Sequence, residues 1–191
     1  MTERLFVSPR GDGFAWLVLD NATGIVRVRG EGTADELGQA ARGVQVPAIL
    51  VVPAEYVLLT RASIPSRQQR QLLQALPYAV EEQLAADVED CHFAVGPRAE
   101  DGSVSAAVIE TTLLAGWLER LDACGVSVEQ ALIDVLQVPR VQGSTLLVDG
   151  DRCLVRTGPT AGFGIDTALV PMAIALLPED QKSSLAILVH P

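Results

Sequence analysis

The sequence predicts a mixed α/β fold in which two lobes share one order of elements: two or three strands, a helix and a further strand. Near each end of the chain, short apolar runs alternate with clusters of turn-forming Gly, Pro, Asp and Asn residues. Each group of runs leads into a helical segment and then into an apolar strand, at residues 48–52 in one lobe and 185–189 in the other. The hydrophobic content of 49% suits a packed core.

Turn residues separate three expected strands in the N-terminal part. These strands are residues 5–7, 14–19 and 25–28, with turns at residues 8–13 and 20–24. Residues 33–41 are expected to form a helix, because Thr33 can act as its N-cap and Glu36 stands three residues later, as in a capping box. Pro53 then closes the buried strand at residues 48–52.

The middle of the chain is expected to complete the first lobe. A strand at residues 104–109 precedes a helix at residues 111–123, which Gly125 ends. A strand at residues 126–133 follows, and Asp134 caps a short helix that stops before Pro139. We therefore expect the first lobe to comprise residues 1–142, with an inserted subdomain at about residues 56–103.

The C-terminal part repeats the order of the N-terminal part without clear sequence identity. Its expected elements are strands at residues 145–148 and 153–156, a third strand within residues 158–164, and a helix at residues 167–177. This second lobe, residues 143–191, looks incomplete, because the sequence stops on what should be a central strand. Duplicated β-β-β-α-β lobes are the plan of the actin and ribonuclease H group, so we expect actin-like or ribonuclease H-like lobes with mixed sheets.

Residues 60–96 carry an unusual arrangement of charge. Apolar residues recur there every fourth position, which predicts a pair of amphipathic helices covering a sheet, with Pro77 beginning the second helix. Basic residues stand at the start and acidic residues toward the end, opposite to the preference of a helix macrodipole. From the residues alone, an ordinary structural role and a partner-binding surface are about equally supported. The residues concerned are Leu72, Leu76, Val80, Leu84, Val88, Arg67, Arg70, Glu81, Glu82, Asp87, Glu89 and Asp90.

Composition excludes several classes of function. The formal net charge of −10 argues against a protein that binds nucleic acid or anionic lipid headgroups, both of which need a basic surface. Cys91, Cys124 and Cys153 are odd in number and far apart, which suits reduced thiols better than a disulfide framework. No secretory signal and no apolar stretch of bilayer-spanning length is visible, so we expect this part of the protein to be soluble and without membrane contact of its own.

No catalytic, cofactor or metal site is expected. The hairpins at residues 8–13 and 148–152 are the two candidates for a phosphate loop, but Pro9 removes a backbone donor from the first and the second is too short. His92 adjoins Cys91 on an expected strand, where neighbours point to opposite faces. The adjacent carboxylates Glu81 and Glu82 lie about 100° apart on an expected helix, which favours a solvated face over a metal site.

The run from Leu59 to Gly96, with its core LPYAVEEQLAADVEDCHFAVG, resembles the cytoplasmic domain of the bacterial type II secretion system protein L. The rest of the chain resembles, more weakly, the cytoplasmic actin-like proteins of type IV pilus assembly. The first resemblance implies a scaffold of the inner-membrane platform that recruits the secretion ATPase through that enzyme's N-terminal region and couples it to pseudopilus assembly. It also implies contact with a second small inner-membrane platform protein, homodimer formation, and a position at the cytoplasmic face of the inner membrane with a membrane span after residue 191.

Six charged residues within residues 60–96 are the candidate contacts for such a partner. They are Arg67, Arg70, Glu81, Glu82, Asp87 and Glu89. With this reading the chain itself is not an enzyme. The alternative is an actin-like ATP-binding protein with weak ATPase activity.

Overall fold

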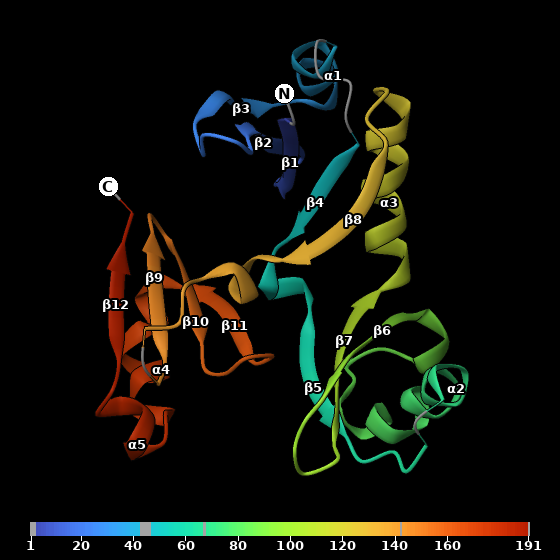
Figure 1. The fold of residues 1–191 in the computed structure, drawn as a ribbon, viewed down its shortest axis with the longest axis vertical. Coiled ribbons are helices and arrows are strands. Elements are labelled where there is room, and N and C mark those ends of the chain that lie inside the picture. Colours follow the sequence, from blue (N-terminus) through green and yellow to red (C-terminus); the bar gives the residue numbers. More distant parts are fainter. Residues whose placement is uncertain (1–2, 43–46, 67, 142, 191) are drawn as a thin grey trace. The chain divides into compact units, whose positions relative to one another are not determined.

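The computed structural model describes residues 3–42, 47–66, 68–141 and 143–190 (Figure 1). The chain forms two compact units: unit 1 is Met1–Pro53 with Thr112–Ile133, and unit 2 is Ala54–Thr111 with Asp134–Pro191. The division into lobes at residues 1–142 and 143–191, with an insert at 56–103, stays a prediction. No helix within the described residues is both long enough and apolar enough to cross a membrane.

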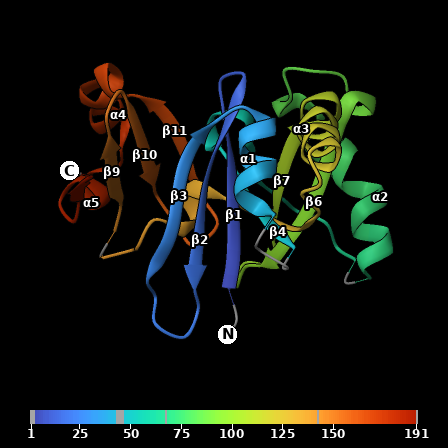
Figure 2. The same ribbon diagram turned by 90° about the horizontal axis from the view of Figure 1, so that it is seen from above.

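Unit 1 contains a mixed sheet, which we call the first sheet, with strand order β3-β2-β1-β4-β8 (Figure 2). Strand β1 pairs antiparallel with β2 and parallel with β4, and β4 pairs parallel with β8. The strands are β1 (Glu3–Arg10), β2 (Gly13–Asp20), β3 (Val26–Gly32), β4 (Ala48–Val52) and β8 (Val128–Ile133).

Alternation of buried and accessible residues explains β1 and β2. Leu5 and Val7 on β1, and Phe14 and Val18 on β2, are at most 2% exposed, while Phe6, Ala15 and Leu17 are partly accessible. Strand β4 lies between β1 and β8, and its consecutive residues Ala48, Ile49 and Leu50 are all buried. A continuous apolar run is typical of a strand that is covered on both faces.

Two helices of unit 1 lie close to each other. Helix α1 (Ala34–Ala41) has the predicted capping box, in which Thr33 accepts from the N–H of Glu36 and the Glu36 carboxylate accepts from the N–H of Thr33. Helix α3 (Thr111–Ala123) ends before Gly125, which has a φ of 82°. A Cβ atom at Gly38 would lie 2.7 Å from the carbonyl oxygen of Cys124, so this approach requires glycine.

The indole of Trp16 lies against the backbone of β3. Trp16 is opposite Gly30 in the register of β2 and β3, and a Cβ atom at Gly30 would be 2.5 Å from Cζ2 of Trp16. Gly30 therefore makes room for the ring, which is only 9% exposed. Trp117, on α3, is also buried.

Unit 2 contains a second sheet, with order β11-β10-β9-β12, in which β9 pairs antiparallel with β10 and parallel with β12. Leu146, Cys153 and Val155 form its fully buried core, and Val170 and Ile174 pack on this core. The elements are β9 (Thr145–Asp149), β10 (Arg152–Arg156), β11 (Gly162–Asp166), α4 (Val170–Leu176), α5 (Glu179–Lys182) and β12 (Ala186–Val189).

Unit 2 also contains a third sheet, with order β5-β7-β6, in which both pairings are antiparallel. Helix α2 (Gln69–Val80) packs on it. The strands are β5 (Leu58–Ala62), β6 (Cys91–Arg98) and β7 (Val104–Glu110).

Most of the strands and helices expected from the sequence are confirmed, two expectations are wrong, and one strand was missed. Strand β1 continues to Arg10, so Ser8 and Pro9 belong to the strand and only Gly11 and Asp12 form the turn. Strand β5 was not expected. No second helix begins at Pro77, which lies inside α2.

Helix α2 tolerates Pro77 because of its position. Proline removes one helical hydrogen bond to the carbonyl four residues earlier, which here belongs to Leu73. Leu73 is 42% exposed and the helix ends three residues after Pro77, so water can bind the carbonyl and few further turns are affected. After Val80 the chain forms short 3-10 turns at Glu81–Gln83 and Val88–Asp90, so Leu84 and Val88 are not part of an α-helix.

Candidate partner-binding surface

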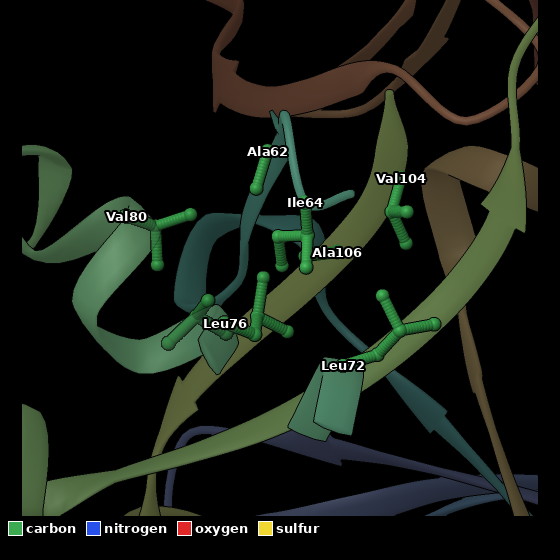
Figure 3. Packing of buried hydrophobic residues seen from close by; sticks show 8 residues of the cluster. Ala62, Ile64, Leu72, Leu76, Val80, Val104 and Ala106 are labelled. Carbon is green, nitrogen blue, oxygen red and sulfur yellow. The ribbon is translucent and has the colours of Figure 1, made fainter. Parts of the chain in front are cut away.

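The third sheet orients α2 through one apolar stripe. Leu72, Leu76 and Val80 follow one another at intervals of four residues, and all three are buried against the sheet (Figure 3). Their partners on the sheet side are Ala62, Ile64, Val104, Ala106 and Val108. Since this stripe faces the sheet, the opposite side of α2 is exposed to solvent.

Arg70 lies in the first turn of α2 and is exposed, as expected. No acidic residue accompanies it in that turn, and the N-cap residue Gln68 makes no capping hydrogen bond through its side chain. Arg70 therefore stands where the helix macrodipole disfavours a positive charge. Arg67 lies outside the described residues.

The four acidic candidates, Glu81, Glu82, Asp87 and Glu89, are all exposed. The expectation of a helix from Pro77 that carries Glu81 and Glu82 early and Asp87 and Glu89 late is wrong, because Val80, with φ −120° and ψ 1°, is the last residue of α2 and Leu84 is extended. Glu81 and Glu82 begin one 3-10 turn, and Asp87 precedes another. Glu81 is the C-cap of α2 and Glu82 follows it, so these two charges stand where the macrodipole of α2 disfavours them, whereas Asp87 and Glu89 lie beyond the α-helix.

These acids nevertheless form a distinct segment of the surface. Residues 71–97 contain five acidic residues and no Lys or Arg, and all five lie within residues 81–90, which we call the acidic segment. None of the five forms an ion pair with another described residue. Glu81, Glu82, Asp87, Glu89 and Asp90 are the members.

A hydrogen bond to β5 anchors the acidic segment, and two of its charges act on Cys91. The hydroxyl of Thr60 on β5 donates to Oε1 of Gln83 at 2.5 Å. Cys91 follows the segment directly, and burial together with the charges of Glu110, Asp90 and Asp87 raises the pKa of its thiol. Cys91 is the first residue of β6 and is opposite Glu110 in the register of β6 and β7.

The sequence interpretation missed two exposed apolar residues on α2. Tyr78 is 76% exposed and Leu73 is 42% exposed. Both lie off the stripe of Leu72, Leu76 and Val80, so the helical period itself could have revealed them. Aromatic residues are enriched at the centres of protein interfaces, and Tyr78 lies three residues before the acidic segment begins at Glu81.

The two candidate phosphate loops are two-residue hairpins. Gly11 and Asp12 connect β1 to β2, and Gly150 and Asp151 connect β9 to β10. Each glycine has a positive φ at the first central position, where a hairpin of this length favours glycine. His92 and Cys91 are neighbours on β6, as expected. Among the described residues, no cluster of His, Cys, Asp and Glu could hold a metal ion.

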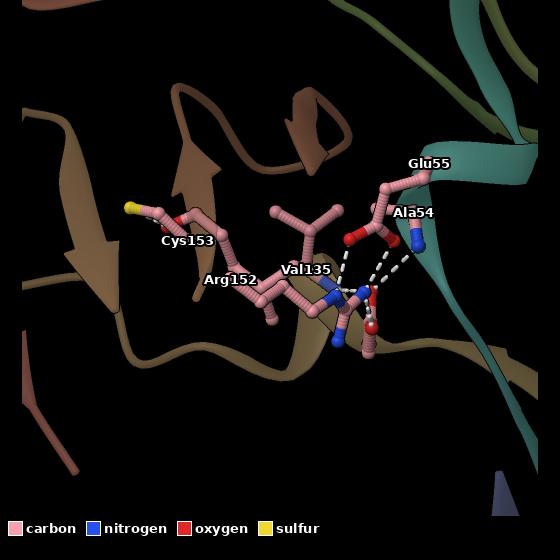
Figure 4. A network of polar contacts seen from close by, with 7 residues as sticks. Ala54, Glu55, Val135, Arg152 and Cys153 are labelled. Atoms are coloured by element: carbon pink, nitrogen blue, oxygen red, sulfur yellow. Dashed lines mark hydrogen bonds and ion pairs between the residues drawn. The ribbon is translucent and has the colours of Figure 1, made fainter. Parts of the chain in front are cut away.

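A cluster of three charged residues in unit 2 was not foreseen. Arg152, the first residue of β10, forms ion pairs with Glu55 and Asp134 (Figure 4), and its Nη2 lies 2.5 Å from an oxygen of each carboxylate. Asp134 also accepts from the N–H of Ala54 at 3.0 Å. Gly164 on β11 packs closely, since a Cβ atom there would lie 2.5 Å from the Glu55 carboxylate.

Burial and charge act on this cluster in opposite directions. Burial raises the pKa of Asp134, while the nearby Arg152 lowers it only in part. Burial would lower the pKa of Arg152, but the hydrogen bonds and charges of Glu55 and Asp134 outweigh it and leave that pKa above its ordinary value. The hydrogen bonds of the cluster join its three side chains to one another and to the backbone of Ala54, so we interpret the cluster as structural.

The comparisons with known proteins agree on one family. The profile of "Type II secretion system (T2SS), protein L" matches residues 7–188. The chain is 33% identical over 134 residues to the type II secretion system protein L of Dickeya chrysanthemi. This alignment covers 70% of this chain and 33% of the relative. It is 34% identical over 132 residues to the protein L of Vibrio cholerae, covering 69% and 32% respectively. The chain thus spans about a third of the length of the curated relatives it matches.

Solved structures support the same assignment. The cytoplasmic domain of EpsL, an inner-membrane component of the type II secretion system of Vibrio cholerae, superposes with a TM-score of 0.85 at 29% identity, over 99% of this chain and 83% of that chain. The PilM–PilN type IV pilus biogenesis complex matches with a TM-score of 0.61 at 14% identity, over 91% of this chain and 65% of that chain, which shows a common fold.

The expected actin-like fold is therefore confirmed, as is the resemblance drawn from residues 59–96. The chain belongs to the type II secretion system protein L family, and so to a component of the inner-membrane platform of that secretion system.

Proposed function

We propose that this chain is the cytoplasmic scaffold part of a protein L that docks the secretion ATPase and couples it to pseudopilus assembly. The observation that carries the proposal is the acidic segment, which forms no ion pair with another described residue and follows α2, the helix that exposes Tyr78 and Leu73. An acidic patch attracts a basic partner and speeds its association, while adjacent apolar groups supply contact area. The partner in this proposal is the N-terminal region of the ATPase.

The module that bears this surface is suited to docking. The core between α2 and the third sheet holds the helix by three buried residues, Leu72, Leu76 and Val80. A surface on such a packed element loses little conformational freedom on binding, which favours affinity. In this proposal the chain supplies the dock, and the ATPase supplies the turnover.

Membership of the platform supports three further parts of the proposal. The protein contacts a second small inner-membrane platform protein, it forms a homodimer, and it lies at the cytoplasmic face of the inner membrane. The full-length protein would carry its membrane span after the residues described here. Each is a property of a protein that assembles at the membrane, and none requires an active site in this chain.

Charge reversal tests the docking surface. The variant Glu81→Lys/Glu82→Lys is expected to weaken binding of the purified N-terminal region of the ATPase by about tenfold or more, equivalent to roughly 1.4 kcal/mol. Glu119→Lys/Asp122→Lys is the matched control, since it makes the same change in net charge at two exposed positions of α3. Biolayer interferometry at two salt concentrations measures both variants, and added salt should reduce the difference.

Equal loss of affinity in both variants would mean that overall charge, and not this surface, governs binding. A separate variant, Arg67→Glu/Arg70→Glu, is expected to weaken ATPase capture while the circular-dichroism spectrum and melting temperature stay unchanged. Unchanged capture would remove the two arginines from the surface.

The competing hypothesis is an actin-like ATP-binding protein with weak ATPase activity. Calorimetry with ATP and magnesium on the full cytoplasmic portion distinguishes the two. Binding heat together with phosphate release, both abolished by changing one acidic residue of this chain, would contradict the scaffold proposal. A catalytically intact ATPase that is captured by the chain, with no heat from ATP alone, would support it.

A further inference from the structure

The third sheet has two edge strands that differ in what lies beside them. Its order is β5-β7-β6, so β5 and β6 are the edges. Strand β11 lies close to β5, and β5 carries the charged residue Arg61. Strand β6 pairs with β7, and within the described residues no strand pairs with its other side. A strand edge of this kind presents unpaired N–H and C=O groups to which another chain can bind.

The loop between β6 and β7 shows which backbone groups of β7 point toward β6. The N–H of Ala99, just after β6, donates to the carbonyl of Ser103, just before β7, at 2.8 Å. The backbone groups of Ser103 therefore point toward β6. Because these groups alternate between the two edges of an antiparallel strand, those of Ala107 and Ile109, four and six residues after Ser103, also point toward β6.

The register then identifies the outward-pointing amides of β6. The partners of these two β7 residues are Ala94 and His92, whose backbone groups therefore bond to β7. The N–H groups of Phe93 and Val95 alternate with them and point away from β7. Cys91 fits this pattern, since its N–H donates to a carbonyl of the preceding 3-10 turn. Phe93 and Val95 are also only partly buried against the core of the third sheet, so an added strand would cover their remaining exposed surface.

The two halves of β6 differ in features that prevent strand addition. Its C-terminal half has Pro97, Arg98 and a register shift against β7 between Val95 and Arg98. Proline, positive charge and β-bulges are all means by which proteins protect an exposed strand edge from pairing. Residues 91–95 contain no proline, no charged residue and no register shift. The unprotected part of the edge is therefore residues 91–95.

This unprotected part begins beside the acidic segment. Glu89 and Asp90 directly precede Cys91, and Glu110 is opposite Cys91 in the register. All three carboxylates are exposed, and none forms an ion pair with another described residue. A strand added here would meet concentrated negative charge at the end near Cys91, so electrostatic complementarity requires basic side chains at that end of the added strand.

We propose that the outer edge of β6 at residues 91–95 binds an extended segment of the secretion ATPase as an added strand, with basic side chains of that segment beside Glu89, Asp90 and Glu110. This inference rests on the proposed docking function and specifies how the partner is held. In strand addition, main-chain hydrogen bonds supply affinity and neighbouring side chains supply specificity. Here the bonds come from Phe93 and Val95, and the specificity comes from the three carboxylates.

Hydrogen exchange of the full-length protein in detergent micelles, with and without the intact secretion ATPase, tests the inference. Electron-transfer fragmentation reads the exchange at single residues. The amides of Phe93 and Val95 are expected to exchange at least about tenfold more slowly when the ATPase is bound. The amides of His92 and Ala94 serve as the internal control, because their bonds to β7 protect them in both samples.

The outcomes separate this inference from the docking function on which it rests. Binding of the ATPase with unchanged exchange at Phe93 and Val95 would overturn strand addition and leave the docking function intact. Absence of binding would overturn both. Protection of these two amides without the ATPase that is lost on dilution would also overturn the inference, because a second copy of this chain would then be the occupant.

A substitution in the same full-length protein provides a second test. Val95→Pro removes an outward N–H and no bond to β7, which is the position that an edge strand tolerates for proline. Val95→Ala is the matched control, because it shortens the same side chain and keeps the N–H. Biolayer interferometry is expected to show at least about tenfold weaker ATPase binding for Val95→Pro than for Val95→Ala. Equal affinities, with unchanged circular-dichroism spectra, would contradict strand addition, and the exchange experiment decides the question if the proline variant does not fold.

Discussion

The first and second sheets share an order of strands and differ in what lies beside their last common strand. Strand β4 contains the letters AILVV and β12 contains AILV, yet the shared letters are one residue out of structural register. Leu50 pairs with Val7 and Ile187 pairs with Leu146, and each partner lies four residues before the glycine of its hairpin, so Leu50 and Ile187 are equivalent. Leu50 is fully buried between β1 and β8, and its counterpart Ile187 is mostly exposed. An apolar run thus predicts a strand from local sequence, while its burial depends on neighbours that are distant in the chain.

The largest expected change in stability comes from substitutions that test this difference in burial directly. In the chain of 191 residues, Leu50→Ala is expected to lower the free energy of unfolding by about 3 to 4 kcal/mol, because it leaves a cavity in a closed core. Ile187→Ala in the same chain should cost no more than about 0.5 kcal/mol. Urea unfolding at 25 °C measures both, and similar losses would show that the two strands are covered alike.

The next largest change in stability is expected from a substitution in the charged cluster of unit 2. Arg152→Leu is expected to lower the free energy of unfolding by about 3 kcal/mol, because it leaves Asp134 partly buried without its counter-charge. The control is Arg27→Leu in the first sheet, where Arg27 is 43% exposed and pairs with Asp20, and the loss should be smaller. A larger loss for Arg27→Leu would reverse this assignment of the stabilising ion pairs.

Capping of α1 and α4, which precede β4 and β12 in the chain, sharpens the comparison further. Thr33→Ala is expected to cost about 1 kcal/mol, because it removes the acceptor for the N–H of Glu36 at the start of α1. Thr33→Ser should restore most of the loss. Asp166→Ala should cost less, since Asp166 caps only the 3-10 turn Thr167–Leu169 before α4. Thermal unfolding of the three variants provides the test.

The smallest expected change is in how stability depends on pH through Asp20. The hydrogen bonds from Arg27, Ala22 and Thr23 hold the pKa of Asp20 below its ordinary value. A lowered folded-state pKa adds stability above the unfolded value of about 3.9, and this stability is lost as the pH falls through the folded value. Asp20→Asn should therefore lower the melting temperature at pH 7, and by progressively less as the pH falls below the unfolded value. The control Asp122→Asn, at an exposed position of α3, should show no such dependence.

Local signals predicted much of the fold. The capping box of Thr33 and Glu36 predicted the start of α1, and Gly125 predicted the end of α3. Gly11 and Gly150 predicted the turns of their hairpins. Strand β5 was missed because no cluster of turn residues marks its start at Leu58. Its last three residues also fall within residues 60–96, which the fourfold apolar spacing assigned to helices. The fourfold spacing of Leu84 and Val88 is coincidental, since these residues pack from an extended segment and a 3-10 turn.

The sequence predicted which charged residues the candidate surface contains, but it did not predict their backbone conformation. Exposure of the acidic residues followed from their charge, but the position of Glu81 and Glu82 depends on the backbone of Val80, which no sequence signal marks. The cluster of Arg152 with Glu55 joins residues that are 97 positions apart, so only the sheet pairing brings them together.

The distribution of three chromophoric or reactive side chains gives each unit its own natural reporter. Both tryptophans of the chain, Trp16 and Trp117, belong to unit 1, so intrinsic fluorescence follows that unit alone. Cys153, fully buried between β9 and β11, belongs to unit 2, and a thiol reagent reaches it only after the strands separate. In a Cys91→Ser/Cys124→Ser variant, where Cys153 is the remaining thiol, fluorescence and thiol reaction can thus show whether the two units unfold together or in turn.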